Sequence, residues 1–309
     1  MKLVLAPMEG LTDPLMRDLL TKVGTYDWCV TEFIRVTDSL FPDHVFYNYC
    51  PELKNAGKTS AGTPVHVQFL GNNPDMLAQN AARVVELGAP AIDLNFGCPA
   101  KTVNRHRGGA ILLDEPEIVH CLVKAVRDAV PAHIPVSAKM RLGYMDESRS
   151  LDNAHAVEDA GASWLTVHAR TKADGYRPPA HWDKLPAIRE AIKIPLIANG
   201  EIWSLEHATR CRDVSGCADL MLGRGAVTRP DLVNIIRHNS AAQRLPWSQL
   251  LQLQQEFLQA HSKTEQGLVG RYKQWLGMLT QGYAEAEQLW AIAKKLRHAE
   301  EIITLLKSA

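Results

Sequence analysis

Short apolar runs recur along the chain as far as Asn239, and most are followed by a stretch with helical spacing of its apolar residues. The runs are rich in Val, Ile and Leu and are nearly continuous in hydrophobicity, as parallel strands covered on both faces are. We predict eight strands: Leu3–Ala6, Trp28–Phe33, Val65–Leu70, Ala91–Asn95, Val136–Arg141, Trp164–His168, Leu196–Asn199 and Asp219–Gly223.

Helical patterns between these runs complete a series of strand–helix units. Examples are Pro74–Leu87, Pro116–Ala129 and Ala154–Ala160. Repeated units of this kind indicate a parallel sheet, and eight strands favour a closed (β/α)₈ TIM barrel over an open doubly wound sheet. Such a barrel takes roughly 250 residues. The 309 residues of the chain leave room for a small additional domain.

The pattern changes after Asn239, where no further strand is expected. Ser248 is placed to cap a helix that carries Leu250, Leu253 and Phe257 at helical spacing. Two more helical stretches cover Tyr272–Gln281 and Ala286–His298. We therefore predict a barrel domain over residues 1–242 and a small all-helical domain over residues 243–309, joined by a linker near Arg244.

Charge gives little indication of a nucleic-acid partner. Lys+Arg and Asp+Glu both number 34, so the formal net charge is zero, and any RNA binding must rest on local basic patches. The helical domain has seven Lys or Arg and six Asp or Glu, which a solvated surface also explains. A hydrophobic share of 46 % and a charged share of 22 % are typical of soluble globular proteins.

The six cysteines form no C-x-x-C pair and no cluster with zinc or iron–sulfur spacing. We expect free thiols in a reducing cytosol and no metal site. The apolar start is too short for a signal peptide, and no run approaches the roughly 20 residues of a membrane span. We therefore expect a cytoplasmic protein.

Polar residues and glycines gather where the predicted strands end, which is where TIM barrels carry their active sites. Asn199-Gly200-Glu201 follows the seventh strand and Gly223-Arg224-Gly225 the eighth, at the recurrent phosphate site of this barrel. Glycines let backbone N–H groups approach phosphate oxygens, and Arg224 adds a positive charge.

Lys139 and His168 end the fifth and sixth strands. A cation and an imidazole at a barrel mouth suit an anionic cofactor, although each alone is also explained by a structural role. Their shared position at the strand ends favours the functional interpretation.

Cys98 follows Asn95 by three residues, just beyond the fourth strand, in a turn shaped by Gly97 and Pro99. A free thiol has a pKa of about 8.5, so near neutrality it is mostly protonated and can donate a proton. By residue type alone, a buried structural cysteine is the commoner explanation. No H-E-x-x-H, P-loop or Rossmann motif is present, so a nicotinamide donor would bind only transiently.

The chain resembles the tRNA-dihydrouridine synthase family over essentially its whole length. The matching segments are Ala6–Gly10, Thr31–Phe33, Gln68–Gly71, Asp93–Pro99, Gly109–Leu113, Lys139–Gly143, His168–Thr171, Ile197–Ile202 and Leu222–Ala226. The Asn-x-Gly-Cys-Pro element is the most specific of these, and the resemblance favours a functional role for Cys98.

The resemblance implies a barrel that binds flavin mononucleotide (FMN), followed by a helical tRNA-binding domain. The residues implied to contact FMN lie at six strand ends: Pro7, Met8 and Glu9; Gln68, Lys139 and His168 along the ring and ribityl chain; and Asn199, Gly200, Glu201, Gly223 and Arg224 around the phosphate. NADPH would reduce the flavin.

The implied reaction is the reduction of a uridine that is flipped out of the tRNA. Reduced FMN gives a hydride to carbon 6 of the uracil, and Cys98 gives a proton to carbon 5. Asn95 and Arg141 are candidates to hold the uracil edge or a nearby phosphate, and Tyr176 to order the loop over it.

The chain looks most like subfamily C, whose members act on uridine 16 in the D-loop. The residues behind this prediction are Arg35, Arg271, Lys273, Gln274, Trp275 and Lys294. Lys294 stands where arginine is expected, so its charge is kept but the bidentate fork is lost. The basic loop Arg105–Arg107 suits a tRNA phosphate as well as it suits an exposed surface. We expect a monomer that binds tRNA.

Two alternatives remain, one a related enzyme and one a protein of another class. An FMN-dependent barrel dehydrogenase could act on a small molecule such as a dihydropyrimidine, but the helical tail and the basic loop count against it. A non-catalytic tRNA-binding protein would need neither Cys98 nor a complete FMN cradle.

Overall fold

The computed structural model describes residues 1–240, 245–260 and 264–308. Its centre is a closed barrel in which every pair of neighbouring strands is parallel. The barrel strands are β1 (Leu3–Leu5), β2 (Trp28–Val30), β4 (Val65–Leu70), β5 (Ile92–Phe96), β6 (Val136–Arg141), β7 (Leu165–His168), β8 (Leu196–Asn199) and β9 (Asp219–Leu222). The pairing of β2 with β4 closes the ring, so the predicted TIM barrel is confirmed.

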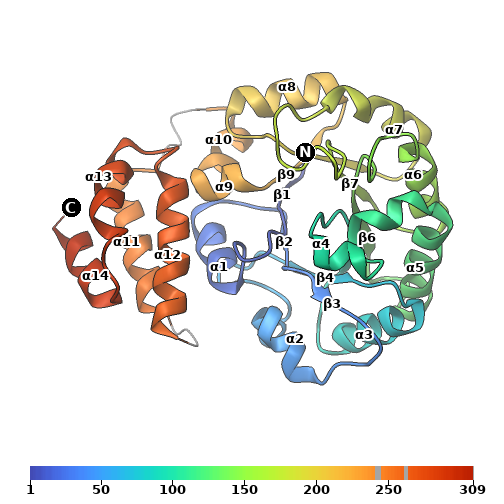
Figure 1. Cartoon of the computed structure of the whole chain (residues 1–309), viewed down its shortest axis with the longest axis horizontal. Coiled ribbons are helices and arrows are strands. Elements are labelled where there is room, and N and C mark those ends of the chain that lie inside the picture. Colours follow the sequence, from blue (N-terminus) through green and yellow to red (C-terminus); the bar gives the residue numbers. More distant parts are fainter. Residues whose placement is uncertain (241–244, 261–263, 309) are drawn as a thin grey trace.

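Helices surround these strands, as Figure 1 shows. They are α1 (Pro14–Val23), α2 (Asp43–Tyr49), α3 (Pro74–Glu86), α4 (Lys101–Arg105), α5 (Pro116–Ala129), α6 (Ser150–Asp159), α7 (Leu185–Ala191), α8 (Leu205–Ser215), α9 (Arg224–Thr228) and α10 (Leu232–His238). Short 3₁₀ turns η1 (Pro51–Asn55), η2 (Gly109–Asp114) and η3 (Trp182–Lys184) join them. None of the helices in the described ranges is both long and apolar enough to cross a membrane.

The predicted strand Trp28–Phe33 is too long. The barrel strand ends at Val30, and a separate two-residue strand, β3 (Ile34–Arg35), pairs only with the end of β4. Thr31 still donates its N–H to His66, but the Glu32 carboxylate accepts the N–H of Gly10. These residues therefore form a loop at the barrel mouth, although Thr31 and Phe33 are of types common in strands.

Side chains alternate between the barrel interior and the surrounding helices. A small apolar cluster contains Val4, Val30, Ile197 and Met221, with Trp28 and Trp164 packed against it. A larger core between the strands and the helices, which continues into the C-terminal helices, contains most of the other buried apolar side chains. The barrel interior also holds buried polar groups such as Asp93, which can bind the polar side chains of a site at the strand ends.

Four helices follow the barrel: α11 (Trp247–Gln259), α12 (Glu265–Leu279), α13 (Ala284–Ala293) and α14 (Ala299–Lys307). In Figure 1 they form a bundle beside α1 and α9, and contacts of α11 with α1 and of α12 with α9 join them to the barrel. The indole N–H of Trp275 donates to the carbonyl of Val227 at 3.2 Å.

Two details of the predicted helical region are wrong, and one lies outside the described residues. The first helix begins at Trp247 after Pro246, whose extended backbone starts it, and Ser248 does not cap it. The last predicted helix ends at Ala293, and an additional helix, α14, begins after His298, whose backbone N–H donates to the Glu301 carboxylate at 3.1 Å. The predicted boundary between residues 242 and 243, with Arg244, falls among residues 241–244, which the structure does not describe.

Candidate active site

A cavity of about 300 Å³ opens at the carboxyl ends of the barrel strands. All eight barrel strands, or the loops that follow them, contribute to its wall. From the predicted site residues, the wall contains Pro7, Met8, Glu9, Gln68, Asn95, Cys98, Lys139, Arg141, His168, Tyr176, Asn199, Gly200, Glu201, Gly223 and Arg224. The structure therefore brings together residues that are spread over more than 200 positions of sequence.

The cavity is strongly electropositive around His168. Burial and the charges of Lys139, Arg141, Arg170 and Arg224 hold the pKa of His168 well below its usual value, so the imidazole is neutral. Burial and the neighbouring guanidinium of Arg141 lower the pKa of Lys139 to about 8. A cavity with this concentration of positive charge favours an anionic ligand.

A tight bend after β8 forms the far side of the cavity. Gly200 has φ +116°, and a Cβ atom there would lie 2.8 Å from Cδ2 of His168, so only glycine fits. The backbone N–H groups of Gly200, Gly223 and Arg224 donate to no other described residue. These free donors, together with the Arg224 guanidinium, could hold a phosphate group.

The carboxylate of Glu201 is committed within the protein. It pairs with Arg170 and accepts the indole N–H of Trp203 at 2.8 Å. Partial burial raises the pKa of Glu201, but these two donors outweigh it and bring the pKa below the usual value. A phosphate role for Glu201 therefore falls to its backbone, because its side chain is negative and already paired.

Cys98 lies in the loop after β5, held on both sides of its peptide. Its N–H donates to Oδ1 of Asn95 at 3.0 Å, and its carbonyl accepts from Nδ2 of Asn104 at 3.0 Å. Burial raises the pKa of the thiol, and the Glu9 carboxylate raises it further, although Arg141 opposes this. The thiol is therefore protonated near neutral pH and can serve as an acid.

Gln68 and Asn95 are linked below this loop. The Nδ2 of Asn95 donates to Oε1 of Gln68 at 2.8 Å, and Nε2 of Gln68 donates to the buried Asp93 at 2.6 Å. Because its Oδ1 also accepts from Gly97, most of the polar capacity of Asn95 is used to position the Cys98 loop.

Arg141 joins two loops of the cavity rim. Its guanidinium donates to the carbonyls of Gly97, Thr171 and Gly175 at 2.8–2.9 Å. The guanidinium groups of Arg141 and Arg224 each lie 5.2 Å from the centroid of the Tyr176 ring. Because Tyr176 is 55 % exposed and belongs to the cavity wall, it places a partly open aromatic ring at the mouth of the cavity.

Four of the predicted tRNA-contacting residues lie outside the cavity wall. Arg35, on β3, is close enough for its charge to lower the pKa of Cys98. Arg271 pairs with Asp13 at 3.0 Å and donates to the carbonyl of Leu11 at 2.9 Å. It therefore joins α12 to the loop between β1 and α1.

The other two are on the helical bundle. Lys273 donates from Nζ to the carbonyls of Lys294 and Leu296 at the end of α13, whereas the side chain of Lys294 is exposed. In the basic loop near Cys98, Arg107 pairs with Glu115, and Arg105 and His106 are exposed.

Several cavity residues were not among the predicted site residues, notably Arg170, Glu32, Phe33, Trp203 and Gln274. Arg170, Glu32 and Phe33 lie in matching sequence segments that could have indicated them. Gln274 comes from α12, more than 45 residues after the last barrel strand, and no pattern in the sequence indicates that it reaches the cavity.

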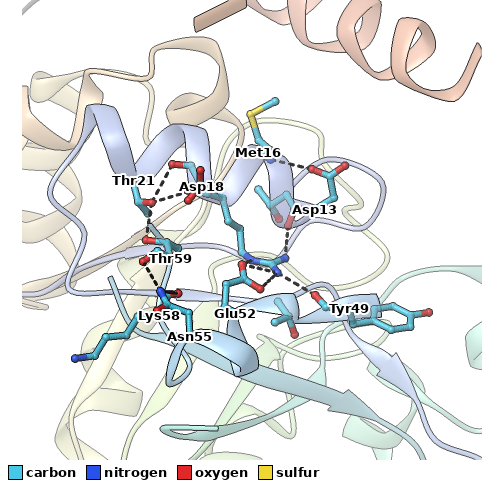
Figure 2. Close-up of polar contacts among 12 residues, drawn as sticks. Asp13, Met16, Asp18, Thr21, Tyr49, Glu52, Asn55, Lys58 and Thr59 are labelled. Carbon is cyan, nitrogen blue, oxygen red and sulfur yellow. Dashed lines mark hydrogen bonds and ion pairs between the residues drawn. The ribbon is translucent and has the colours of Figure 1, made fainter. Parts of the chain in front are cut away.

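A buried ion pair supports the loop that carries Met8 and Glu9. Arg17, on α1, is fully buried and contacts both carboxylate oxygens of Glu52 at 2.9–3.0 Å. Its other donors bind the carbonyls of Thr12 and Tyr49 at 2.9 Å. Figure 2 shows Glu52 and Tyr49 beneath α1, with dashed lines that join both residues to the guanidinium reaching down from this helix.

Comparison with known proteins bears directly on this site. The family model described as dihydrouridine synthase matches residues 4–307. The chain belongs to the dihydrouridine synthase family. It is 52 % identical to the tRNA-dihydrouridine(16) synthase of Pseudomonas syringae pv. tomato, over 99 % of this chain and 98 % of that protein. It is 48 % identical to the protein of the same name from Haemophilus influenzae, over 98 % of each.

Solved structures share the barrel with this dihydrouridine synthase at much lower identity. An old yellow enzyme homologue from Zymomonas mobilis is 12 % identical, with a TM-score of 0.53, covering 77 % of this chain and 88 % of that one. A 2-naphthoyl-CoA reductase is 10 % identical, with a TM-score of 0.58, covering 77 % and 50 %. These similarities show the fold alone.

Proposed function

We propose that this protein reduces a uridine of tRNA to 5,6-dihydrouridine, with FMN as the bound cofactor and NADPH as the hydride source. The observation that carries the proposal is a cysteine, Cys98, in the wall of a cation-lined cavity in a member of the dihydrouridine synthase family, where burial raises the pKa of the thiol. The relatives named tRNA-dihydrouridine(16) synthase support position 16 as the target.

The residues of the cavity fit FMN. The free N–H groups of Gly200, Gly223 and Arg224 suit its phosphate. Lys139, beside Asp93 and open to the cavity, suits the electron-rich part of the ring system. When bound, the flavin supplies the hydride that the uracil accepts at carbon 6.

Cys98 has the second chemical role, as donor of a proton from Sγ to carbon 5 of the uracil. Its raised pKa keeps the proton on sulfur until the ring becomes basic. Arg141 and Asn95 hold the loop that carries the thiol, and Tyr176 offers a stacking surface to a base at the cavity mouth.

We further propose that residues 1–242 are the catalytic barrel domain and residues 243–309 a helical domain that binds tRNA. Gln274 in the cavity wall supports this division of labour, since a substrate entering the cavity meets the bundle. The six cysteines, all free thiols, agree with a reducing cytoplasm. We also propose that the enzyme works as a monomer, which light scattering on the purified protein can test.

The test is to map dihydrouridine by reverse-transcription stops on tRNA that lacks the modification, incubated with NADPH and protein. Wild type should produce dihydrouridine at position 16, and Cys98→Ala should lose most of it while its flavin is still reduced by NADPH. Cys121→Ala is the matched control, because Cys121 is exposed and outside the cavity. Modification elsewhere would contradict position 16. Flavin-loaded protein that oxidises NADPH without modifying tRNA would contradict the proposed substrate.

A further inference from the structure

Arg170 is a fully buried arginine in the cavity wall, and the proposed reaction gives it no role. It follows β7 by two residues and is 0 % exposed. Its guanidinium pairs with Glu201 and donates from Nε to the carbonyl of Arg177 at 2.7 Å. Its remaining contact is with His168, whose Nε2 lies 3.3 Å from Nη1 of Arg170.

The contact between Arg170 and His168 has only one chemically sensible direction. A guanidinium has five N–H donors and no acceptor, so Nη1 must donate. The Nε2 of His168 must then be the acceptor, which requires that it carry no hydrogen. In a neutral imidazole the hydrogen is therefore on Nδ1.

The same edge of the His168 ring is closed to ligands. A Cβ atom on Gly200 would lie 2.8 Å from Cδ2 and 3.2 Å from Nε2, so the Gly200 backbone packs against this edge. The Nδ1 edge differs, because it has no hydrogen-bond partner among the described residues, and His168 is part of the cavity wall.

The charges around His168 favour the neutral ring. Lys139, Arg141, Arg170 and Arg224 all oppose its protonation, as does its burial. The carboxylate of Glu201, which binds Arg170, is also paired with Trp203. The ring therefore stays neutral, and its tautomer is decided by the contact with Arg170.

We propose that Arg170 is a positioning residue that fixes His168 as the Nδ1–H tautomer, so that the imidazole offers a hydrogen-bond donor to the cavity. The ligand group facing His168 must then be an acceptor, such as a carbonyl or phosphate oxygen of the flavin. This deepens the proposed function, on which the identity of the ligand rests.

The direct test is a long-range ¹H–¹⁵N NMR correlation of the histidine side chains, with His168 assigned by the loss of its signals in His168→Gln. In wild-type holoprotein, we expect Nε2 of His168 to be unprotonated and Nδ1 to be protonated between pH 6 and about 8. A protonated Nε2 would overturn the proposal, whatever the protein does to tRNA.

Two variants separate the role of Arg170 from general support of the loop. In Arg170→Leu, the Nε2–H tautomer should become populated. The Kd for FMN should then rise about tenfold, because about one hydrogen bond to the flavin is lost. Glu201→Gln removes the ion pair but leaves Arg170 beside His168, so the tautomer should remain Nδ1–H. If Arg170→Leu keeps the wild-type tautomer, or Glu201→Gln changes it equally, the proposal is wrong. If Arg170→Leu does not fold, the wild-type spectrum alone decides.

Because the NMR readout needs no turnover, it is independent of the substrate. A protein that shows the expected tautomer and yet makes no dihydrouridine would overturn the proposed function while leaving the inference about Arg170 standing.

Discussion

Breaking the buried ion pair of Arg17 and Glu52 should strongly destabilise the barrel. Substituting Glu52→Gln keeps the shape of the side chain but removes its charge and turns one acceptor into a donor. Arg17 is 0 % exposed, and Glu52 8 %, so water cannot replace the lost partner. Leaving a buried charge without its partner costs about 3–5 kcal/mol.

This free energy can be converted into a melting shift. The entropy of unfolding is about 2.1 cal/mol/K per residue, so the 309 residues give about 0.65 kcal/mol/K. A loss of about 3–5 kcal/mol therefore corresponds to a fall in Tm of about 5–8 °C. Thermal unfolding followed by circular dichroism, at fixed protein and flavin concentration, measures it.

A second bidentate pair, between α2 and α3, provides the matched control. Arg83 contacts both carboxylate oxygens of Asp43 at 2.7–2.8 Å, with the same fork geometry, but both side chains are well exposed. Because solvent screens and replaces such contacts, Asp43→Asn should lower Tm several-fold less than Glu52→Gln. Equal shifts in the two variants would refute the reasoning, since the two pairs share the fork geometry but differ strongly in burial.

Two other substitutions test the Cys98 loop and the barrel interior. Gly109 has φ +69°, and a Cβ there would lie 2.8 Å from the carbonyl oxygen of Cys98. Gly109→Ala should therefore slow single-turnover uridine reduction about tenfold or more. In the control, Gly62→Ala, the glycine has φ +84° and open space around it, so the rate should stay near wild type. His66, wholly buried with its pKa lowered by burial to about 3, stays neutral where the unfolded chain takes up a proton. The free energy of unfolding therefore keeps its full contribution from His66 above about pH 6.5, and this contribution falls by up to about 1.4 kcal/mol per pH unit as the pH drops towards 3. His66→Phe should reduce the difference in urea midpoint between pH 7 and pH 5. An unchanged difference would contradict the buried neutral state.

The sequence predicts the barrel well because its strands are buried on both faces. The runs Val65–Leu70, Val136–Arg141 and Leu196–Asn199 begin and end in the structure where the sequence indicates. The errors occur where hydrophobicity does not decide the conformation. Thr31 and Phe33 are of types common in strands, but residues 31–33 form a loop in which Glu32 binds the N–H of Gly10.

The sequence predicts those cavity residues that lie at the ends of strands. In a parallel barrel the carboxyl ends of all strands meet at one rim, so residues such as Lys139 and His168 come together whatever their separation in sequence. Gln274 was not predicted, because its place in the wall depends on how α12 packs against α9. The internal contacts of Arg271 and Lys273 were also not predicted, because the sequence does not distinguish a basic side chain that binds RNA from one that binds backbone carbonyls within the protein.

The motif around Cys98 contains the support of the thiol as well as the thiol itself. Asp93, inside the barrel, accepts hydrogen bonds from Ser137 and Gln68 at 2.6 Å. A carboxylate only accepts and a backbone N–H only donates, so the amides of Gln68 and Asn95 between these two ends have one orientation that satisfies every link. Cys98 is thereby tied through side chains to the middle of two barrel strands. A proton donor needs such fixed placement, because a misplacement of about 1 Å can cost about a hundredfold in rate. The spacing of Asp93, Asn95 and Cys98 is therefore a consequence of geometry: two alternate residues of one strand face the interior, and the loop that follows folds back over the second.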